Sequence, residues 1–261
     1  MSEPALITKP TVLITGAANR LGACMARRFA ETGWHVVIHY RASADAAQAL
    51  ASSLPSAETV QADLAEHGAP EAMVESLAGR LPDWRALVNS ASVFEYDDAG
   101  AIDPGIFSYA MQTNAAAPVL LAQAFLARAG ARGGRRVINV LDQKLWNPNP
   151  DFFSYSMSKA ALGMATRMMA MEHGESLDRI YGLAPGAMLP SHDQQADEHQ
   201  TSGRMNLLQR LTRPEELAEA AVFLAEGHLA SGETICVDSG QHLLSQPRDV
   251  LFMAREQSDA A

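Results

Sequence analysis

Residues 11–40 read TVLITGAANRLGACMARRFAETGWHVVIHY. The segment opens with an apolar run at 11–15 that is typical of a buried strand, and a turn with a glycine at each end follows at 16–22. An alanine-rich helix is expected up to about residue 32, and a second buried strand at 34–40. A strand, a turn, a helix and another strand predict a right-handed βαβ crossover, and therefore a parallel sheet.

The same alternation continues along the chain. Strands are expected near 59–61, 86–89, 137–141, 180–183 and 234–237, and helices near 44–53, 70–80, 104–114, 116–129 and 154–171, with one more opening at Pro214. The polar segment 186–203 holds His192 and His199 and is expected to be a mobile loop. No repeat or composition break divides the chain, so residues 1–261 are predicted to form a single α/β domain, with a polar tail from about 246.

Composition limits the classes of partner. The chain has 261 residues, of which 48% are apolar and 19% charged, enough for one large α/β domain with a full core. A net charge of −10 argues against nucleic acid as a partner, because phosphate backbones need basic surfaces. Cys24 and Cys236 match no disulfide or metal spacing, and no apolar run is long enough to span a bilayer. We therefore expect a soluble cytoplasmic protein that binds a small molecule, without a metal or a membrane.

The turn at 16–22 has the glycines of a pyrophosphate-binding turn only in part. Gly16 and Gly22 lie where a helix N-terminus can meet a phosphate, but Arg20 occupies the place of the usual third glycine. A nucleotide site and a plain structural turn are about equally compatible with this segment alone.

The strand at 34–40 indicates which nucleotide would bind. A site for NAD usually carries an acidic residue roughly 20 positions after the turn, whereas residues 39–43, HYRAS, contain none. Arg41 and Ser43 suit the 2′-phosphate of NADP, through a charge-assisted contact and a hydroxyl donor. NADP is the predicted cofactor, although Arg41 could also be a solvated surface residue.

Three side chains between 142 and 159 have a spacing that suits proton transfer. Tyr155 and Lys159 lie one turn apart on the helix expected at 154–171, and an ammonium beside a phenol lowers its pKa from roughly 10. Asp142 precedes Tyr155 by 13 positions (155 minus 142) and could fold back over it. Tyr155 is therefore a candidate proton donor. The alternatives are a half-buried ring, a solvated amine and an aspartate that only forms a turn.

Taken together, the motifs resemble the short-chain dehydrogenase/reductase family over nearly the whole chain. They are Thr15-Gly16-x-x-x-Arg20-x-Gly22, Asp63-Leu64, Asn89-Ser90-Ala91-Ser92, Asn114, Tyr155-x-x-x-Lys159 and Pro185-Gly186. The resemblance implies a Rossmann-type, doubly wound parallel sheet of about seven strands with helices on both faces. It also implies an oxidoreductase that transfers hydride from a nicotinamide, with Tyr155 as the acid and Lys159 binding the ribose.

The resemblance implies further roles. Asn114 would hold a water in the proton relay, Asp63 and Leu64 would flank the adenine, and Asn89, Ala91 and Ser92 would lie under the cofactor. The expected cofactor-binding set is completed by Gly16, Arg20, Leu21, Gly22, His39, Tyr40, Arg41, Ser43, Lys159, Pro185 and Gly186. The family is commonly tetrameric through the helices that here begin near Pro104 and Ser154. Met164, Met168, Met169 and Met171 could line that contact, or could belong to the core.

Several departures from the family pattern point to one branch of it. Asp142 replaces the usual serine, Arg20 replaces a glycine, and Ala91-Ser92 replaces Ala-Gly. With HYRAS at 39–43 and with Phe94, they resemble the pteridine reductases, including dihydromonapterin and dihydrofolate reductases of this fold. In that branch an arginine reaches both pyrophosphate and substrate and a phenylalanine stacks on the pterin. The implied substrate-binding residues are Arg20, Ser92, Phe94, Asp142 and Tyr155.

The chemistry of Asp142 favours the same branch. Ketone reduction builds negative charge on oxygen, which a serine hydroxyl stabilises and an ionised carboxylate opposes. Reduction of a C=N bond places the proton on nitrogen, and a carboxylate beside Tyr155 can assist that step. The sequence predicts an NADPH-dependent reductase of a pteridine-like substrate. The alternatives are a reductase of an oxoacyl or sugar-like ketone and a non-catalytic NADP sensor, which would not need Tyr155 and Lys159.

Overall fold

The computed structural model describes residues 9–174, 176–191 and 194–259, so His192 lies outside the described residues. Its strands are β1 (Thr11–Ile14), β2 (His35–Tyr40), β3 (Ala57–Gln61), β4 (Trp84–Asn89), β5 (Arg136–Val140), β6 (Arg179–Pro185) and β7 (Thr234–Val237). They form one parallel sheet in the order β3-β2-β1-β4-β5-β6-β7. Strands β1 to β3 build the sheet towards one edge, and β4 to β7 build it from β1 towards the other edge. The predicted doubly wound Rossmann-type fold is therefore confirmed.

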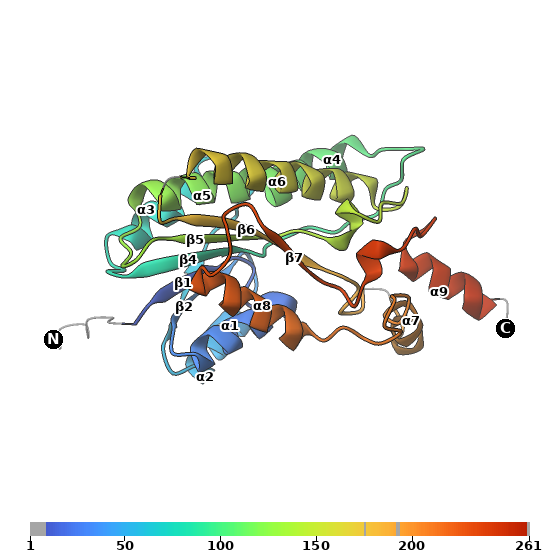
Figure 1. Ribbon diagram of the computed structural model, residues 1–261, viewed down its shortest axis with the longest axis horizontal. Coiled ribbons are helices and arrows are strands. Elements are labelled where there is room, and N and C mark those ends of the chain that lie inside the picture. Colours follow the sequence, from blue (N-terminus) through green and yellow to red (C-terminus); the bar gives the residue numbers. More distant parts are fainter. Residues whose placement is uncertain (1–8, 175, 192–193, 260–261) are drawn as a thin grey trace.

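Helices cover both faces of the sheet (Figure 1). One layer contains α1 (Arg20–Glu31), α2 (Ala44–Ser53) and α8 (Pro214–Glu226), and the other contains α3 (Ala69–Ala78), α4 (Pro104–Met111), α5 (Ala117–Arg128) and α6 (Phe153–Glu172). Each face has its own apolar core: Met25 and Phe29 pack in one, and Trp84, Leu121 and Phe125 in the other. Because the central strands are buried on both faces, they read as continuous apolar runs rather than alternating ones.

Two segments differ from the sequence-based expectation. The helices predicted at 104–114 and 116–129 are joined by a π-helical turn, η1 (Gln112–Ala116), which contains Asn114. The predicted loop at 186–203 contains a short helix, α7 (Ala196–Ser202), closed at its start by a capping box between Gln195 and Glu198. Its polar sequence, ADEHQTS, has no apolar periodicity, so only the cap marks it as helical.

The segment after Gln246 also forms a helix, α9 (Val250–Asp259). Its first half, VLFMA, is apolar, and Val250, Leu251 and Ala254 are buried, so the expectation of a polar tail from about 246 is wrong for this part of the chain. In Figure 1, α7 and α9 lie beside each other beyond the carboxyl ends of the strands. An ion pair between Arg255 and Glu198, 3.2 Å apart, joins these two helices.

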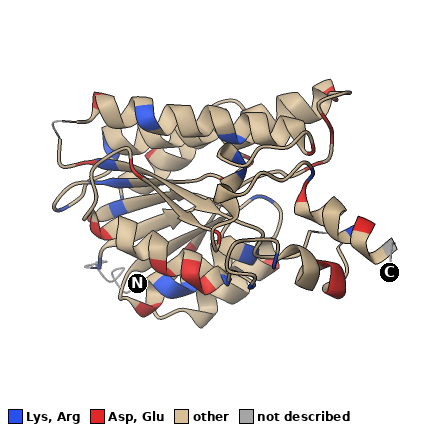
Figure 2. Cartoon of the chain, turned by 45° about the vertical axis from the view of Figure 1, so that its right-hand side comes forward, with Lys and Arg blue, Asp and Glu red and all other residues tan. Residues whose placement is uncertain are grey.

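Charged residues of both signs occur throughout the part of the chain that Figure 2 shows. In the view of Figure 2, basic and acidic segments are interspersed over the helices of both layers, and neither sign forms a continuous stripe on this face. Among the described helices, none combines the length and the apolar character that crossing a bilayer requires.

Candidate active site

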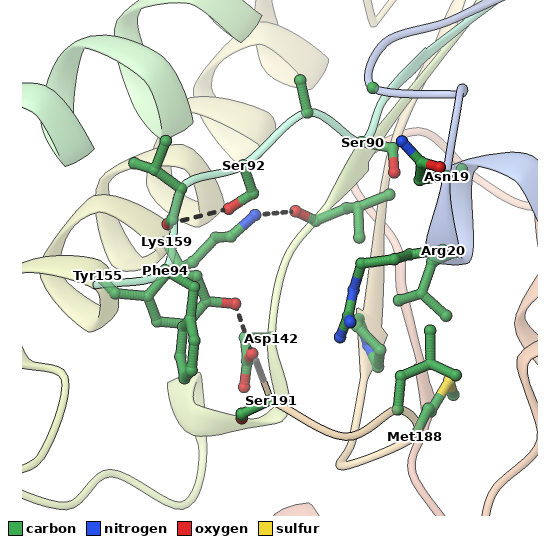
Figure 3. Close-up of a pocket in the computed structure, with 18 of the residues that line it drawn as sticks. Asn19, Arg20, Ser90, Ser92, Phe94, Asp142, Tyr155, Lys159, Met188 and Ser191 are labelled. Atoms are coloured by element: carbon green, nitrogen blue, oxygen red, sulfur yellow. Dashed lines mark hydrogen bonds between the residues drawn. The ribbon is translucent and has the colours of Figure 1, made fainter. Parts of the chain in front are cut away.

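A cavity of about 530 Å³ lies at the carboxyl ends of the central strands. It is lined by every residue predicted for the site except Asn89 and Asn114: Gly16, Arg20, Leu21, Gly22, His39, Tyr40, Arg41, Ser43, Asp63, Leu64, Ala91, Ser92, Phe94, Asp142, Tyr155, Lys159, Pro185 and Gly186. Figure 3 shows the part of the cavity where Asp142, Tyr155 and Lys159 approach one another, with Arg20 across from them. This edge of a doubly wound sheet, at its topological switch point, is where ligands bind in such folds.

The turn after β1 brings the backbone close to the cavity. Gly16 has a φ of +65°, and a Cβ on it would lie 2.9 Å from Ala91 Cα. A Cβ on Gly22 would lie 2.5 Å from the Gly16 carbonyl oxygen, so α1 could not approach the turn with a larger residue there. The N-terminus of α1 consequently faces the cavity, where its amides and helix dipole suit a phosphate. The residues present therefore fit a dinucleotide pyrophosphate.

His39 holds this turn from the neighbouring strand. The Gly16 N–H donates to His39 Nδ1 at 3.1 Å, so the ring proton must reside on Nε2, which lies 3.1 Å from the Ala62 carbonyl oxygen. Burial lowers the pKa of His39 to about 4 despite the hydrogen bond to Ala62. The imidazole is therefore neutral at physiological pH and acts as an internal support of the turn as well as a wall of the cavity.

Stability should consequently fall when the medium is acidified. Between pH 6.5 and about 4 the unfolded chain binds a proton at His39 that the folded chain does not, so the free energy of unfolding decreases as the pH falls, by roughly 3 kcal/mol over the window. His39→Asn keeps a hydrogen-bond acceptor but removes the titration. Denaturant unfolding at several pH values should show a smaller decrease in this variant, whereas His67→Asn, at an exposed position, should match the unmodified protein. Equal decreases in all three would contradict the assignment.

Arg20 begins α1 with a φ of +53° and reaches across the cavity. Its Nη2 donates to the Pro190 carbonyl oxygen at 2.9 Å, which connects the glycine turn to the segment after β6. The guanidinium thus spans from the start of α1 to the segment after β6, and its predicted contacts with pyrophosphate and substrate stay predictions.

Arg41 and Ser43 line the cavity directly after β2. The Arg41 guanidinium donates to the hydroxyl of Tyr109 on α4, which also lines the cavity. Ser43 precedes α2 and makes no capping hydrogen bond with its hydroxyl. Sequence reasoning missed Tyr109, because the contact between residues 41 and 109 joins two distant segments.

The reactive centre contains Asp142, Tyr155 and Lys159. The Tyr155 hydroxyl donates to Asp142 Oδ2 at 2.6 Å, as the sequence spacing suggested it could. Asp142 Oδ1 accepts the Lys144 N–H at 2.9 Å, which fixes the orientation of the carboxylate. Lys159 Nζ donates to the Val140 carbonyl oxygen at 2.8 Å and lies 5.7 Å from the centroid of the Tyr155 ring.

The expected lowering of the Tyr155 pKa by Lys159 is wrong for this arrangement. Burial and the contact with Asp142 raise the pKa of Tyr155 well above its ordinary value. Burial also raises the pKa of Asp142, and it lowers that of Lys159 to about 8. The carboxylate binds the hydroxyl directly, whereas the ammonium lies over the ring and binds a carbonyl. Tyr155 therefore keeps its proton at neutral pH, as a donor must.

Asn114 and Asn89 support the site without lining the cavity. Asn114 Oδ1 accepts the Val93 N–H at 2.8 Å, and its Nδ2 donates to the Val93 carbonyl oxygen and to Ser158 Oγ. The π-helical turn η1 carries it, a distortion that often marks functional positions. Asn89 donates to Asn139 Oδ1 at 2.8 Å within the sheet. The predicted water bound to Asn114 stays a prediction.

Phe94 belongs to an aromatic cluster beside the reactive centre. Its ring stacks on Phe152 at 4.1 Å between centroids and meets Tyr155 edge-on at 4.7 Å. Phe252 of α9 stacks on Phe152 in turn. Because Phe152 covers one face of Phe94, only the other face can meet a flat ligand. The side chains that the sequence analysis missed here are Lys144, Phe152, Asp249, Val250, Leu251 and Phe252.

Comparisons with known proteins place the chain in a family. Residues 16–242 match the family model described as "Enoyl-(Acyl carrier protein) reductase". Pteridine reductase 1 of Leishmania tarentolae is 30% identical over 281 residues, which cover 90% of this chain and 97% of that protein. The chain belongs to the short-chain dehydrogenase/reductase family, so the family prediction is confirmed.

Two solved structures resemble the whole molecule. FolM alternative dihydrofolate reductase 1 from Brucella canis, complexed with NADP, superposes with a TM-score of 0.85 at 32% identity, covering 95% of this chain and 99% of that one. The angucycline C-6 ketoreductase LanV with bound NADP has a TM-score of 0.83 at 28% identity, covering 90% and 96%. The similar proteins thus include both reaction types considered from the sequence.

Proposed function

We propose that this protein is an NADPH-dependent reductase of a pteridine-like substrate, of the dihydropterin, dihydromonapterin or dihydrofolate class. The observation that carries the proposal is the 2.6 Å hydrogen bond from Tyr155 to the Asp142 carboxylate, where ketone reductases of the family have a serine. Phe94, next to Tyr155, offers a flat aromatic surface for a fused heterocycle. The pteridine reductase and dihydrofolate reductase relatives support the same substrate class.

Some residues of the cavity would bind the cofactor, and others would transfer the proton. The α1 N-terminus and Arg20 would hold the pyrophosphate, and Arg41 with Ser43 the 2′-phosphate; the bound nicotinamide would supply the hydride. Tyr155 holds a proton at its hydroxyl and passes it, directly or through Asp142, to the substrate nitrogen. Asp142 is partly exposed to the cavity, so the pair would regain its proton from solvent that enters there. Lys159, whose ammonium lies over the Tyr155 ring, would bind the nicotinamide ribose.

The alternative function is reduction of an oxoacyl or sugar-like ketone. The ketoreductase LanV, with its similar fold, keeps this reading open, and a protonated Asp142 could donate to a developing oxyanion. Its raised pKa makes protonation easier than for an exposed aspartate.

One assay separates the candidates. NADPH oxidation is followed spectrophotometrically with dihydropteridines, dihydrofolate and a panel of aldehydes and ketones. Higher kcat/KM for the pteridine class supports the proposal. Turnover restricted to ketones would establish the alternative, and NADPH binding without turnover of any substrate would indicate a sensor.

NADPH should be preferred over NADH because Arg41 and Ser43 stand where an NAD site needs an acid. Losing a charge-assisted phosphate contact costs on the order of 1.5 to 3 kcal/mol, so Arg41→Ala should reduce kcat/KM for NADPH roughly tenfold to a hundredfold. The value for NADH should hardly change. Arg128→Ala, at the exposed end of α5, is the control for loss of a surface charge. Equal use of both cofactors by the unmodified protein would refute the preference.

We also propose a homotetramer in the cytoplasm. Met164, Met168 and Met171 are 58%, 62% and 81% exposed along α6 and form an apolar stripe, whereas Met169 packs against the core. A stripe of this kind supports helix pairing between subunits. Light scattering after gel filtration tests the assembly, and Met168→Glu should shift it towards smaller species. A monomeric unmodified protein would contradict the proposal.

A further inference from the structure

A buried ion pair lies against the reactive centre. Lys144 Nζ is 2.7 Å from Asp249 Oδ2, and the two side chains are only 5% and 12% exposed. The ammonium also donates to Asn149 Oδ1 at 2.9 Å and lies 5.8 Å from the centroid of the Phe152 ring. Both charged residues line the same cavity as Tyr155. Burying an ion pair costs desolvation energy that its attraction often fails to recover, so stability alone is a weak explanation for this pair.

The pair connects Asp142 to the C-terminal helix. Lys144 lies in the 3₁₀ turn η2 (Gln143–Leu145), and its own N–H holds Asp142 Oδ1. Asp249 precedes α9, where its Oδ1 accepts the Leu251 N–H at 3.0 Å and its own N–H donates to Asp151 Oδ2 at 2.8 Å. The ion pair therefore joins the turn that orients Asp142 to the segment that closes one side of the cavity.

We propose that Lys144 and Asp249 are positioning residues for the Asp142–Tyr155 pair: they dock the start of α9 against the turn that holds Asp142, and their opposite charges set the pH range in which the pair can pass a proton. This proposal rests on the proposed reductase function, and it adds two residues that position Asp142 and Tyr155 and set the pH range of their proton transfer.

The charges that face the two reactive groups are few and act in opposite directions. After the larger effect of burial, the pKa of Asp142 is influenced by Tyr155, Lys144 and Lys159, and both cations lower it. The pKa of Tyr155 is raised by burial and Asp142, and further by Asp249. Arg248, next to Asp249 in the chain, is bound by Asp151 and Glu256 instead. Lys144 thus lowers the pKa of Asp142 whereas Asp249 raises that of Tyr155, so the two charges act on the two members of the pair in opposite directions.

The test compares pH profiles of kcat for variants of nearly constant volume. Lys144→Met removes the cation and should move the profile to higher pH, while Asp249→Asn removes the anion and should move it to lower pH. Each displacement should be roughly half a pH unit to one, as expected of a single nearby, partly screened charge. The double variant should return close to the original midpoint, and Lys144→Arg should retain it. A purely structural role would lower turnover without opposite displacements.

Arg248→Met is the matched control. It removes a cation that anchors the same C-terminal segment to Asp151 but does not face Asp142 or Tyr155. Its profile should keep the original midpoint even if its melting temperature falls. The proposal is overturned if the pH profiles of Lys144→Met and Asp249→Asn move in the same direction or do not move at all. It is also overturned if the profile of Arg248→Met moves by an equal amount.

The outcome is separable from that of the proposed function. If the unmodified protein reduces ketones rather than pteridines, the proposed substrate class fails, but the pH comparison is made with the ketone. Carboxyl-carbon NMR titration of Asp142 gives the same comparison without turnover. There, Lys144→Met should raise the midpoint of Asp142 and Lys144→Arg should leave it in place; an unchanged midpoint in Lys144→Met overturns the proposal.

Discussion

Replacing Tyr155 by phenylalanine is expected to lower turnover with NADPH by about a hundredfold to ten-thousandfold, the usual contribution of a positioned general acid. Burial and Asp142 raise the pKa of the Tyr155 hydroxyl, so the hydroxyl keeps its proton at neutral pH. It donates to Asp142 Oδ2 at 2.6 Å. Phenylalanine keeps the ring that packs against Phe94, so folding and the shape of the cavity should be preserved. Steady-state kinetics and a melting curve on the same preparation measure both properties.

Cofactor binding provides the control for this variant. The dissociation constant of NADPH, measured by fluorescence titration, should be nearly the same in Tyr155→Phe and in the unmodified protein. Lys159→Ala should instead weaken NADPH binding as well as turnover, because under the proposed function the ammonium would bind the ribose. Full activity of the phenylalanine variant would mean that the proton comes from another group.

Replacing Asp142 by serine should change the two substrate classes in opposite directions. The substitution removes the carboxylate that assists protonation at nitrogen, so pteridine reduction should fall by about a hundredfold to ten-thousandfold. It also provides the hydroxyl donor that ketone reductases use, so any weak ketone reduction should hold or rise. Kinetics of both proteins on one dihydropteridine and one activated ketone make the comparison.

A purely structural role of Asp142 would give a different result. The carboxylate caps the turn at Lys144, with Oδ1 accepting its N–H, and serine is itself a good capping residue. If capping were its whole function, the serine variant would be nearly neutral for every substrate. Asp142→Asn separates charge from shape because it keeps the cap oxygen and loses the ionisable group. Unchanged pteridine turnover in both variants would return the ketone reductase reading to first place.

The regular elements and the chemical identity of the site follow from local sequence. The run at 11–40 specifies a strand, a close turn and a helix through period, glycine placement and length, which are properties of neighbouring residues. The four-residue spacing of Tyr155 and Lys159 places them on one helix face without any tertiary information. By contrast, α7 was missed as a helix because a short polar segment carries little periodic signal. The apolar run VLFMA that opens α9 is too short to show a helical period, and its burial depends on contacts with distant segments.

The pKa values of the reactive groups are decided by the tertiary structure. The prediction from sequence that Asp142 could lie beside Tyr155 is confirmed. The prediction that Lys159 would lower the pKa of Tyr155 is wrong. In the folded protein the carboxylate contacts the hydroxyl, and burial adds to its effect, so the pKa rises. The pair Lys144–Asp249 was invisible for the same reason, because its partners are distant in the chain. A pKa depends on burial and on through-space distances between charges, and both exist only once the sheet, the turns and α9 have packed together.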